Sequence, residues 1–120
     1  MKWTIELYTD NKGKSPVLDF VKSLPAKHRA KVYREIDLLE QLGINLQYPH
    51  TRKMQGYEEK KLWELRIKFG SDISRVFYFL YHNNTFVLLH GFVKKSDKTP
   101  QREINKALSN LDEYIERSEE

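Results

Sequence analysis

Residues 61–103 read KLWELRIKFGSDISRVFYFLYHNNTFVLLHGFVKKSDKTPQRE, and this stretch decides the fold. It contains three runs that are rich in aromatic and branched residues and alternate with a period of two, as strands do. The runs are 61–69, 73–81 and 86–94. The connections GSD and HNNT are short enough for hairpins, so we predict three consecutive antiparallel strands. A short polar turn follows, and Thr99-Pro100 then predicts the start of a helix.

The sequence before this stretch predicts one further strand and two helices. Residues 3–8 alternate apolar and polar side chains, which indicates a strand. Ser15-Pro16 provides a helix N-cap followed by Pro, so we expect a first helix to run to about Ser23. We expect a second helix over about 25–42, ended by Gly43.

The second predicted helix has one apolar stripe and one charged face. The stripe comprises Val32, Ile36 and Leu39, with Leu38 and Leu42 beside it. The charged face contains Lys31, Arg34 and Glu35. A helix of this kind is suited to cover a sheet. Residues 44–60 are polar and irregular and predict a loop, whereas the helix after Pro100 has its own apolar stripe.

These elements give the order β-α-α-β-β-β-α. They predict an α+β fold in which a small, mostly antiparallel sheet has its helices packed on one face. The chain has 120 residues, so we expect one domain over residues 1–120. It has no cysteine, which excludes disulfides, cysteine nucleophiles and thiolate zinc sites and fits a reducing compartment. No apolar run approaches membrane-spanning length and the first residues lack an apolar signal core, so we expect a cytoplasmic protein.

Positive charge is concentrated in the strand-rich part of the chain. The formal net charge is +4. Residues 61–111 contain nine Lys or Arg and four Asp or Glu, whereas residues 112–120 contain five acidic residues and one Arg. A basic surface attracts polyanions and speeds their association. The distribution therefore favours a nucleic-acid partner.

Two arginines lie on neighbouring predicted strands. Arg66 shares a face of its strand with Glu64 and Lys68, and Arg75 shares a face with aromatic residues. In the last strand, alternation puts on one face Phe86, Leu88, His90, Phe92 and Lys94. Periodicity does not decide which faces of the three strands meet. If Arg66 and Arg75 share the open face, their guanidinium groups suit phosphate and the nearby rings suit base stacking, which favours RNA.

Cleavage of RNA without a metal requires three groups. One removes the proton of the 2′-hydroxyl, one stabilises the charge of the phosphorane, and one protonates the leaving 5′-oxygen. Arginine stabilises charge but transfers protons poorly. Lysine becomes a base or an acid when neighbouring cations lower its pKa, as Lys94 and Lys95 close to Arg75 would allow.

The same residues admit plainer interpretations. Lys94 and Lys95 fit a solvated strand end, Arg75 fits an ion pair with Glu64 or Asp72, and His90 fits a core or edge histidine. We expect His28 and His50 at the surface and His82 in the turn. Four scattered histidines without a carboxylate cluster do not indicate a metal site.

Motifs in this part of the chain resemble those of a known family. They are ELR at 64–66, RVFY at 75–78, and LLHGFVKK at 88–95 followed by Thr99-Pro100 and Glu103-Ile104. They are similar to motifs of the RelE/HigB-like toxins of bacterial type II toxin–antitoxin modules, and most similar to the phage-derived HigB-like branch. The last motif is fairly specific, ELR alone is not, and the similarity spans most of the chain.

The resemblance implies a RelE-like fold of the microbial-ribonuclease type. It implies an mRNA endoribonuclease, an mRNA interferase, that acts on the ribosome, inhibits translation and arrests growth. Cleavage would proceed by 2′-hydroxyl attack on the phosphate, with no metal and no other cofactor. The implied partners are mRNA, the ribosome and a helix-turn-helix, HigA-like antitoxin, with operator DNA bound only through the antitoxin and no membrane involved.

Carried over to this sequence, the resemblance assigns catalysis to Arg66, Arg75, Lys94 and Lys95, with Arg75 on the scissile phosphate. We assign RNA binding to Lys68, Lys98, Arg102 and Tyr57. RelE carries lysines on the strand before its arginine, whereas this chain has Leu62-Trp63-Glu64 there, and the C-terminal tyrosine of RelE has no match. The candidates for proton transfer are, in order, Lys94, Lys95, His90, Tyr57 and Glu64. The missing lysines support an alternative, a non-catalytic protein of the same fold that binds RNA or the antitoxin.

Overall fold

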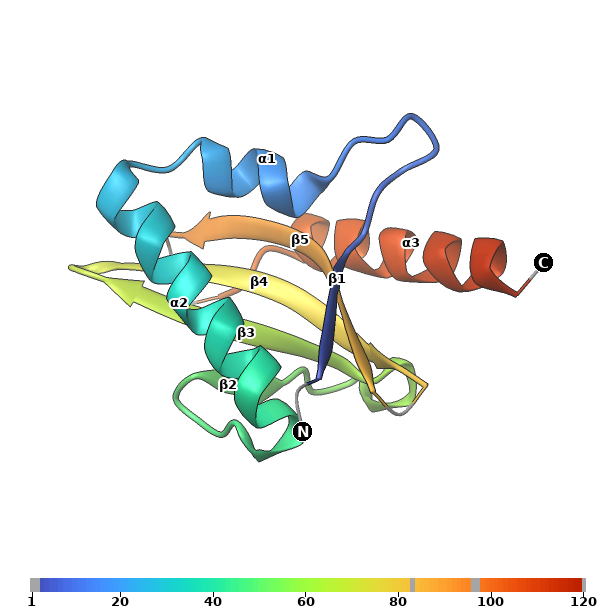
Figure 1. The fold of residues 1–120 in the computed structure, drawn as a ribbon. Helices are drawn as coiled ribbons and strands as arrows, with labels where there is room; N and C mark the ends of the chain where they lie inside the picture. The colour runs from blue at the N-terminus through green and yellow to red at the C-terminus, as the bar shows by residue number, and fades with distance from the viewer. Residues whose placement is uncertain (1–2, 83, 96–97, 120) are drawn as a thin grey trace.

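In the computed structural model the chain forms a five-stranded mixed sheet with helices on both faces (Figure 1). The structure describes residues 3–82, 84–95 and 98–119. The strands are β1 (Thr4–Leu7), β2 (Thr51–Lys53), β3 (Leu62–Phe69), β4 (Asp72–Tyr81) and β5 (Thr85–Lys94). The helices are α1 (Pro16–Lys22), α2 (Ala26–Leu42) and α3 (Gln101–Ser118), with 3-10 turns η1 (Gly43–Asn45) and η2 (Glu58–Lys60). No described helix has the length and apolar character needed to span a membrane.

The strands lie in the order β1-β5-β4-β3-β2. β1 runs parallel to β5, and the other neighbours are antiparallel, so both predicted hairpins are confirmed. The prediction of a loop over 44–60 missed β2, which pairs with β3. Three residues are too few for alternation to be visible in a sequence. Parts of two predicted turns lie outside the described residues, namely Asn83 of HNNT and Ser96 and Asp97 after β5.

The helices cover opposite faces of the sheet. α1 and α2 pack on one face, over a core that includes Leu65, Val76 and Leu88. α3 packs on the other face, over Phe77 and Phe79. The prediction that the helices share one face is therefore wrong for α3. The reason lies in β4, where every side chain from Ser74 to Phe79 is buried, so that the strand needs cover on both sides.

A β-bulge in β5 changes which of its residues share a face. The β4–β5 register shifts between Phe77 and Tyr78, because Phe77 pairs with His90 but Tyr78 pairs with Leu88. One extra residue reverses the alternation. The predicted common face of 86–94 is therefore wrong, since Phe86 and Leu88 pack under α2 whereas Phe92 packs under α3.

Close packing fixes α1 on β5. The Ser15 hydroxyl caps α1 by accepting from the backbone N–H of Leu18 at 3.2 Å, as predicted. A Cβ atom at Gly91 of β5 would lie 2.5 Å from the ring of Phe20 in α1. Only glycine at position 91 lets the helix approach the strand this closely.

Two polar residues of α2 face inward, against prediction. Glu35 was placed on the charged face but is buried, and its Oε2 lies 2.9 Å from Nδ1 of His50. His28 was expected at the surface but is buried, with Nε2 2.8 Å from the hydroxyl of Ser74. Periodicity shows which face is mainly apolar but does not show a polar side chain that has a specific buried partner.

A candidate nucleic-acid interface

Four cationic side chains surround one buried carboxylate on the α3 face of the sheet, beyond the part that α3 covers. We call this group the cationic cluster; it consists of Arg52, Glu64, Arg66, Arg75 and Lys94. The strand register produces it. Arg66 lies directly opposite Arg75, and Arg52 lies opposite Glu64. Lys94 lies opposite Ile73, two residues before Arg75 on the same strand. Opposite residues have Cβ atoms about 5 Å apart and diagonal neighbours lie within reach of long side chains.

Glu64 is the only carboxylate in the cationic cluster and is 0% exposed. Its Oε1 lies 3.2 Å from Nη2 of Arg52, and its Oε2 lies 3.8 Å from Nε of Arg75. Neither contact has the geometry of a hydrogen bond, and both carboxylate oxygens are buried. One negative charge thus faces four positive charges, which leaves a local excess of positive charge.

Arg75 is 3% exposed, and its Nε and Nη1 atoms are buried without a hydrogen-bond partner among the residues that the structure describes. Burial lowers the pKa of Arg75, the charge of Glu64 opposes this, and Arg66 and Arg52 lower the pKa further. Buried polar groups are almost always hydrogen-bonded, and a buried cation without full compensation is costly. The arrangement suits an anion that supplies the missing acceptors.

Lys94 ends β5 beside Arg75 and is half-buried. Burial lowers the pKa of its amine, and the charge of Arg75 lowers it further. Glu64 opposes these effects, whereas Arg52 and Arg66 add to them. The direction of this shift is the one that favours proton transfer by a lysine.

Arg66 joins the cationic cluster to the loop before β2. Its Nη1 donates to the carbonyl oxygen of Pro49 at 3.1 Å, and its guanidinium carbon lies 5.0 Å from the centre of the Tyr48 ring. Arg66 and Lys68 also line a pocket of about 210 Å³, together with His50. The Nε of Arg66 is buried and has no hydrogen-bond partner within the described ranges.

The structure brings together three of the four residues to which we assigned catalysis: Arg66, Arg75 and Lys94. Lys95 lies exposed beyond the end of β5. Sequence reasoning missed two residues of the site, Arg52 and Tyr48, because both lie in or next to the strand that was not predicted. The signal for them was the basic and aromatic character of the segment QYPHTRK, residues 47–53. Because we predicted a loop there, these side chains could not be placed on either face of the sheet.

Other predicted site residues lie near the start of α3 instead. Tyr57 is half-buried, and its hydroxyl accepts from the side chain of Gln101 at 3.1 Å. His90 is paired with α3, since its Nε2 lies 2.6 Å from Oε1 of Glu103. The side chain of Arg102 is 75% exposed, and Lys98 lies exposed just before the helix. Of the proton-transfer candidates, only Lys94 and Glu64 belong to the cationic cluster.

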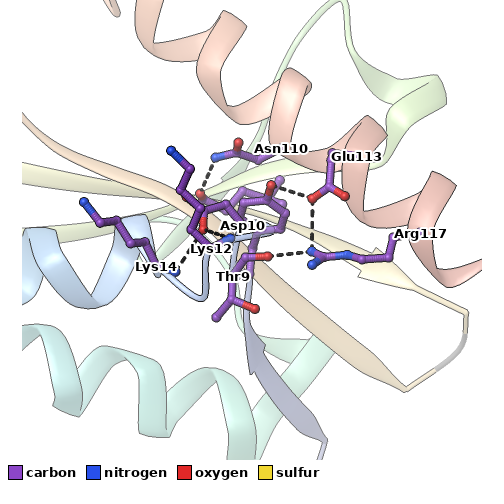
Figure 2. A network of polar contacts seen from close by, with 9 residues as sticks. Thr9, Asp10, Lys12, Lys14, Asn110, Glu113 and Arg117 are labelled. Atoms are coloured by element: carbon purple, nitrogen blue, oxygen red, sulfur yellow. Dashed lines mark hydrogen bonds and ion pairs between the residues drawn. The ribbon is translucent and has the colours of Figure 1, made fainter.

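The covered half of the same sheet face carries a different polar network (Figure 2). The hydroxyl of Tyr8 donates to Oε1 of Glu113 at 2.7 Å, and Arg117 lies 3.0 Å from the same oxygen. Arg117 also donates to the carbonyl of Thr9, and Asn110 donates to the carbonyl of Leu89. We call this the clamp network, because it fastens α3 to the end of β1 and to β5.

Within the described ranges, no three His, Cys, Asp or Glu side chains lie close enough together to hold a metal ion. Residues 19–112 match the family described as phage-derived protein Gp49-like (DUF891). No curated protein matches the sequence.

Proposed function

Because this chain belongs to the phage-derived Gp49-like family, which is of the RelE/HigB-like toxin kind, we propose that it is the toxin of a type II toxin–antitoxin module and a metal-independent mRNA endoribonuclease. The observation that carries the proposal is the cationic cluster, in which two buried nitrogen atoms of Arg75 have no hydrogen-bond acceptor among the described residues. A helix-turn-helix antitoxin is the partner that such a toxin requires. The ribosome, with mRNA in its decoding site, is the proposed place of action.

The cationic cluster supports a phosphate ligand more than other anions. Guanidinium groups bind phosphate through paired hydrogen bonds, and Arg66 and Arg75 stand side by side on neighbouring strands. Around Arg75, the side chain of Arg52 is 50% exposed, and Tyr48 is 68% exposed. The RNA backbone would approach Arg75 past the half-exposed side chain of Arg52.

The proposed reaction is an internal transfer of the phosphate. The 2′-oxygen attacks phosphorus while the bond to the 5′-oxygen breaks, which leaves a 2′,3′-cyclic phosphate and a 5′-hydroxyl. Arg66 and Arg75 stabilise the charge of the phosphorane. Lys94, with its lowered pKa, transfers either the 2′-hydroxyl proton or the proton that the 5′-oxygen receives, and water exchanges the other.

Induced expression in bacteria tests this proposal. Wild-type protein should arrest growth and produce cuts at defined positions in a translated message, mapped by primer extension. Arg75→Ala should remove the main stabiliser of the phosphorane and lower cleavage by about 100- to 1,000-fold. The matched control is Arg34→Ala, an exposed arginine of α2, which should remain fully toxic. Full toxicity of a folded Arg75→Ala protein would contradict the site.

A non-catalytic RNA-binding protein is the second candidate function. It is favoured by the shortage of proton-transfer groups in the cationic cluster, where Glu64 is enclosed by its arginines and His90 is engaged by Glu103. The same mapping experiment separates the two functions. An intact message that stays bound to the protein would support the binder, whereas cuts that disappear in Arg75→Ala would support the enzyme.

A further inference from the structure

Tyr48 is an exposed aromatic residue at the border of the cationic cluster. Its exposed fraction of 68% is the highest among the large apolar side chains of the described residues. Its ring lies over the guanidinium of Arg66 at 5.0 Å. A phenol ring with this exposure adds nothing to the core, and exposing it to water costs free energy.

The loop that carries Tyr48 is bound to two different elements, β3 and α2. The backbone N–H of Arg66 donates to the carbonyl of His50 at 2.8 Å, and the Arg66 side chain donates to the carbonyl of Pro49 at 3.1 Å. On the other side, Nδ1 of His50 lies 2.9 Å from the buried Oε2 of Glu35. Residues 49 and 50 are thus held by backbone and side-chain contacts, which keeps the backbone next to Tyr48 in place beside Arg66.

Tyr48 lies near Arg75 in addition to Arg66. The charge state of its phenol affects the pKa of Arg75, so the ring lies within electrostatic range of both guanidinium groups that would hold a phosphate. In a nucleic acid, the base lies next to its phosphate. An aromatic ring beside a phosphate site is therefore positioned for the base of an adjoining nucleotide.

We propose that Tyr48 is a stacking platform for the nucleobase adjoining the phosphate held by Arg66 and Arg75. One ring face contacts Arg66, and the outward face receives the base. The inference rests on the proposed function and specifies its ligand, an unpaired nucleotide in single-stranded RNA. Every base has a flat π-face, so the contact adds affinity with little sequence preference.

A two-way binding comparison tests the platform. The probe is a short fluorescent oligoribonucleotide that carries 2′-O-methyl groups, so that it lacks the nucleophile and remains intact. Tyr48→Ala should weaken its binding by about 10-fold, within the factor of roughly 5 to 150 that one stacked base contributes. Tyr48→Phe and Tyr48→Trp should bind like the wild type, because they retain a flat ring. Tyr33→Ala, an exposed tyrosine of α2, is the matched control and should have no effect.

The second arm of the comparison uses oligonucleotides with one abasic position, moved along the strand. At the position that meets Tyr48, removal of the base should weaken wild-type binding and leave Tyr48→Ala binding unchanged. The stacking proposal would be overturned if, at every abasic position, Tyr48→Ala and the wild type lost affinity by the same factor. It would also be overturned if Tyr48→Ala bound intact RNA with wild-type affinity.

The salt dependence of binding separates failure of the platform from failure of the proposed function. Tyr48→Ala should keep the wild-type slope of affinity against salt, because no phosphate contact is lost, whereas Arg75→Ala should flatten it. Wild-type binding that is unaffected by Arg75→Ala, or absent, would overturn the proposed function and the platform together. A normal effect of Arg75→Ala with none from Tyr48→Ala would overturn only the platform.

Discussion

Under α3, polar groups meet complementary partners; beyond the start of α3, on the same face of the sheet, they do not. In the clamp network the Tyr8 hydroxyl, the Glu113 carboxylate and the Arg117 guanidinium contact one another at 2.7 and 3.0 Å. In the cationic cluster, both oxygens of Glu64 and two nitrogens of Arg75 are buried and have no hydrogen-bond partner in the described part of the chain. The two regions lie on the same face of the sheet and both include β5, but we expect them to differ in function.

The difference follows from what each region has to do. Satisfied polar contacts stabilise a fold, because every buried donor meets an acceptor. Unsatisfied cations lower stability in the free protein but bind an anion strongly, because the anion repairs the deficit. We therefore expect substitutions in the clamp network to change mainly stability, and substitutions in the cationic cluster to change mainly the response to anions.

The largest effect is expected from Glu64→Gln. This change removes the one negative charge that faces four cations, and loss of one partner from a buried ion pair costs about 3–5 kcal/mol of unfolding free energy. Added sulfate should then restore much of the loss by binding to the folded protein only. Chemical denaturation at increasing sulfate concentration measures both quantities.

Glu113→Gln is the control for general effects of sulfate. It removes a carboxylate from the clamp network, where the side chain is 41% exposed and its partner Arg117 is 40% exposed. Its cost should be about 1 kcal/mol and should not depend specifically on sulfate. If both variants recover equally in sulfate, the distinction between the two regions fails.

The second effect is alkaline loss of stability through Tyr8. Burial raises its pKa to about 12, helped by the hydrogen bond to Glu113 and opposed by Arg117. The folded state therefore holds this proton more tightly than the unfolded state, where the pKa is about 10. The contribution of Tyr8 to stability is complete below pH of about 10. It is lost as pH rises through about 12, by at most about 3 kcal/mol. Denaturation from pH 8 to 12 should show a smaller loss in Tyr8→Phe than in the wild type, whereas Tyr48→Phe should match the wild type.

Most of the fold could be predicted from the sequence, and the exceptions have local causes. The long strands and the two longer helices carry clear periodicity, and Ser15-Pro16 marks the start of α1. Their positions therefore agree with prediction to within a few residues. β2 was missed because Thr51–Lys53 is too short to alternate. The faces of β5 were misassigned because the bulge at its middle depends on pairing with β4, which no pattern within one strand reports.

The candidate site was predicted in part for the same reasons. Arg66, Arg75 and Lys94 lie on long strands, so their alternation was readable once the register was known. Arg52 and Tyr48 depend on the path of an irregular segment. The pairing of His50 with Glu35 depends on contacts across 15 residues and between different elements. Such contacts are set by tertiary packing and leave no periodic trace.

The third effect is the coupling between Tyr8 and Glu113. A double-mutant cycle with Tyr8→Phe and Glu113→Gln should give a coupling energy of about 1 kcal/mol, typical of a hydrogen bond to a charged group that is partly exposed. RNA cleavage by each variant should stay within about twofold of the wild type, since the clamp network contacts no proposed substrate group. Cleavage that falls in parallel with stability would show that α3 and the cationic cluster act as one unit.

The smallest effect expected is a change in the titration of Lys94, and its sign is opposite to that of Tyr8. Burial and Arg75 lower the pKa of Lys94 in the folded protein below 10.5, its value in the unfolded chain. At pH values between the folded and the unfolded pKa, the unfolded state holds more protons, so the contribution of Lys94 to stability rises with pH. Bound phosphate favours the charged amine and should raise the pKa. NMR titration of isotopically labelled lysine side chains should show this rise in the wild type. Arg75→Met, which deletes the strongest repelling charge, should move Lys94 towards 10.5 even without phosphate. A Lys94 that titrates with the exposed lysines under all conditions would show that the cations are too far apart to share one phosphate, and the two halves of the sheet face would then differ in packing alone.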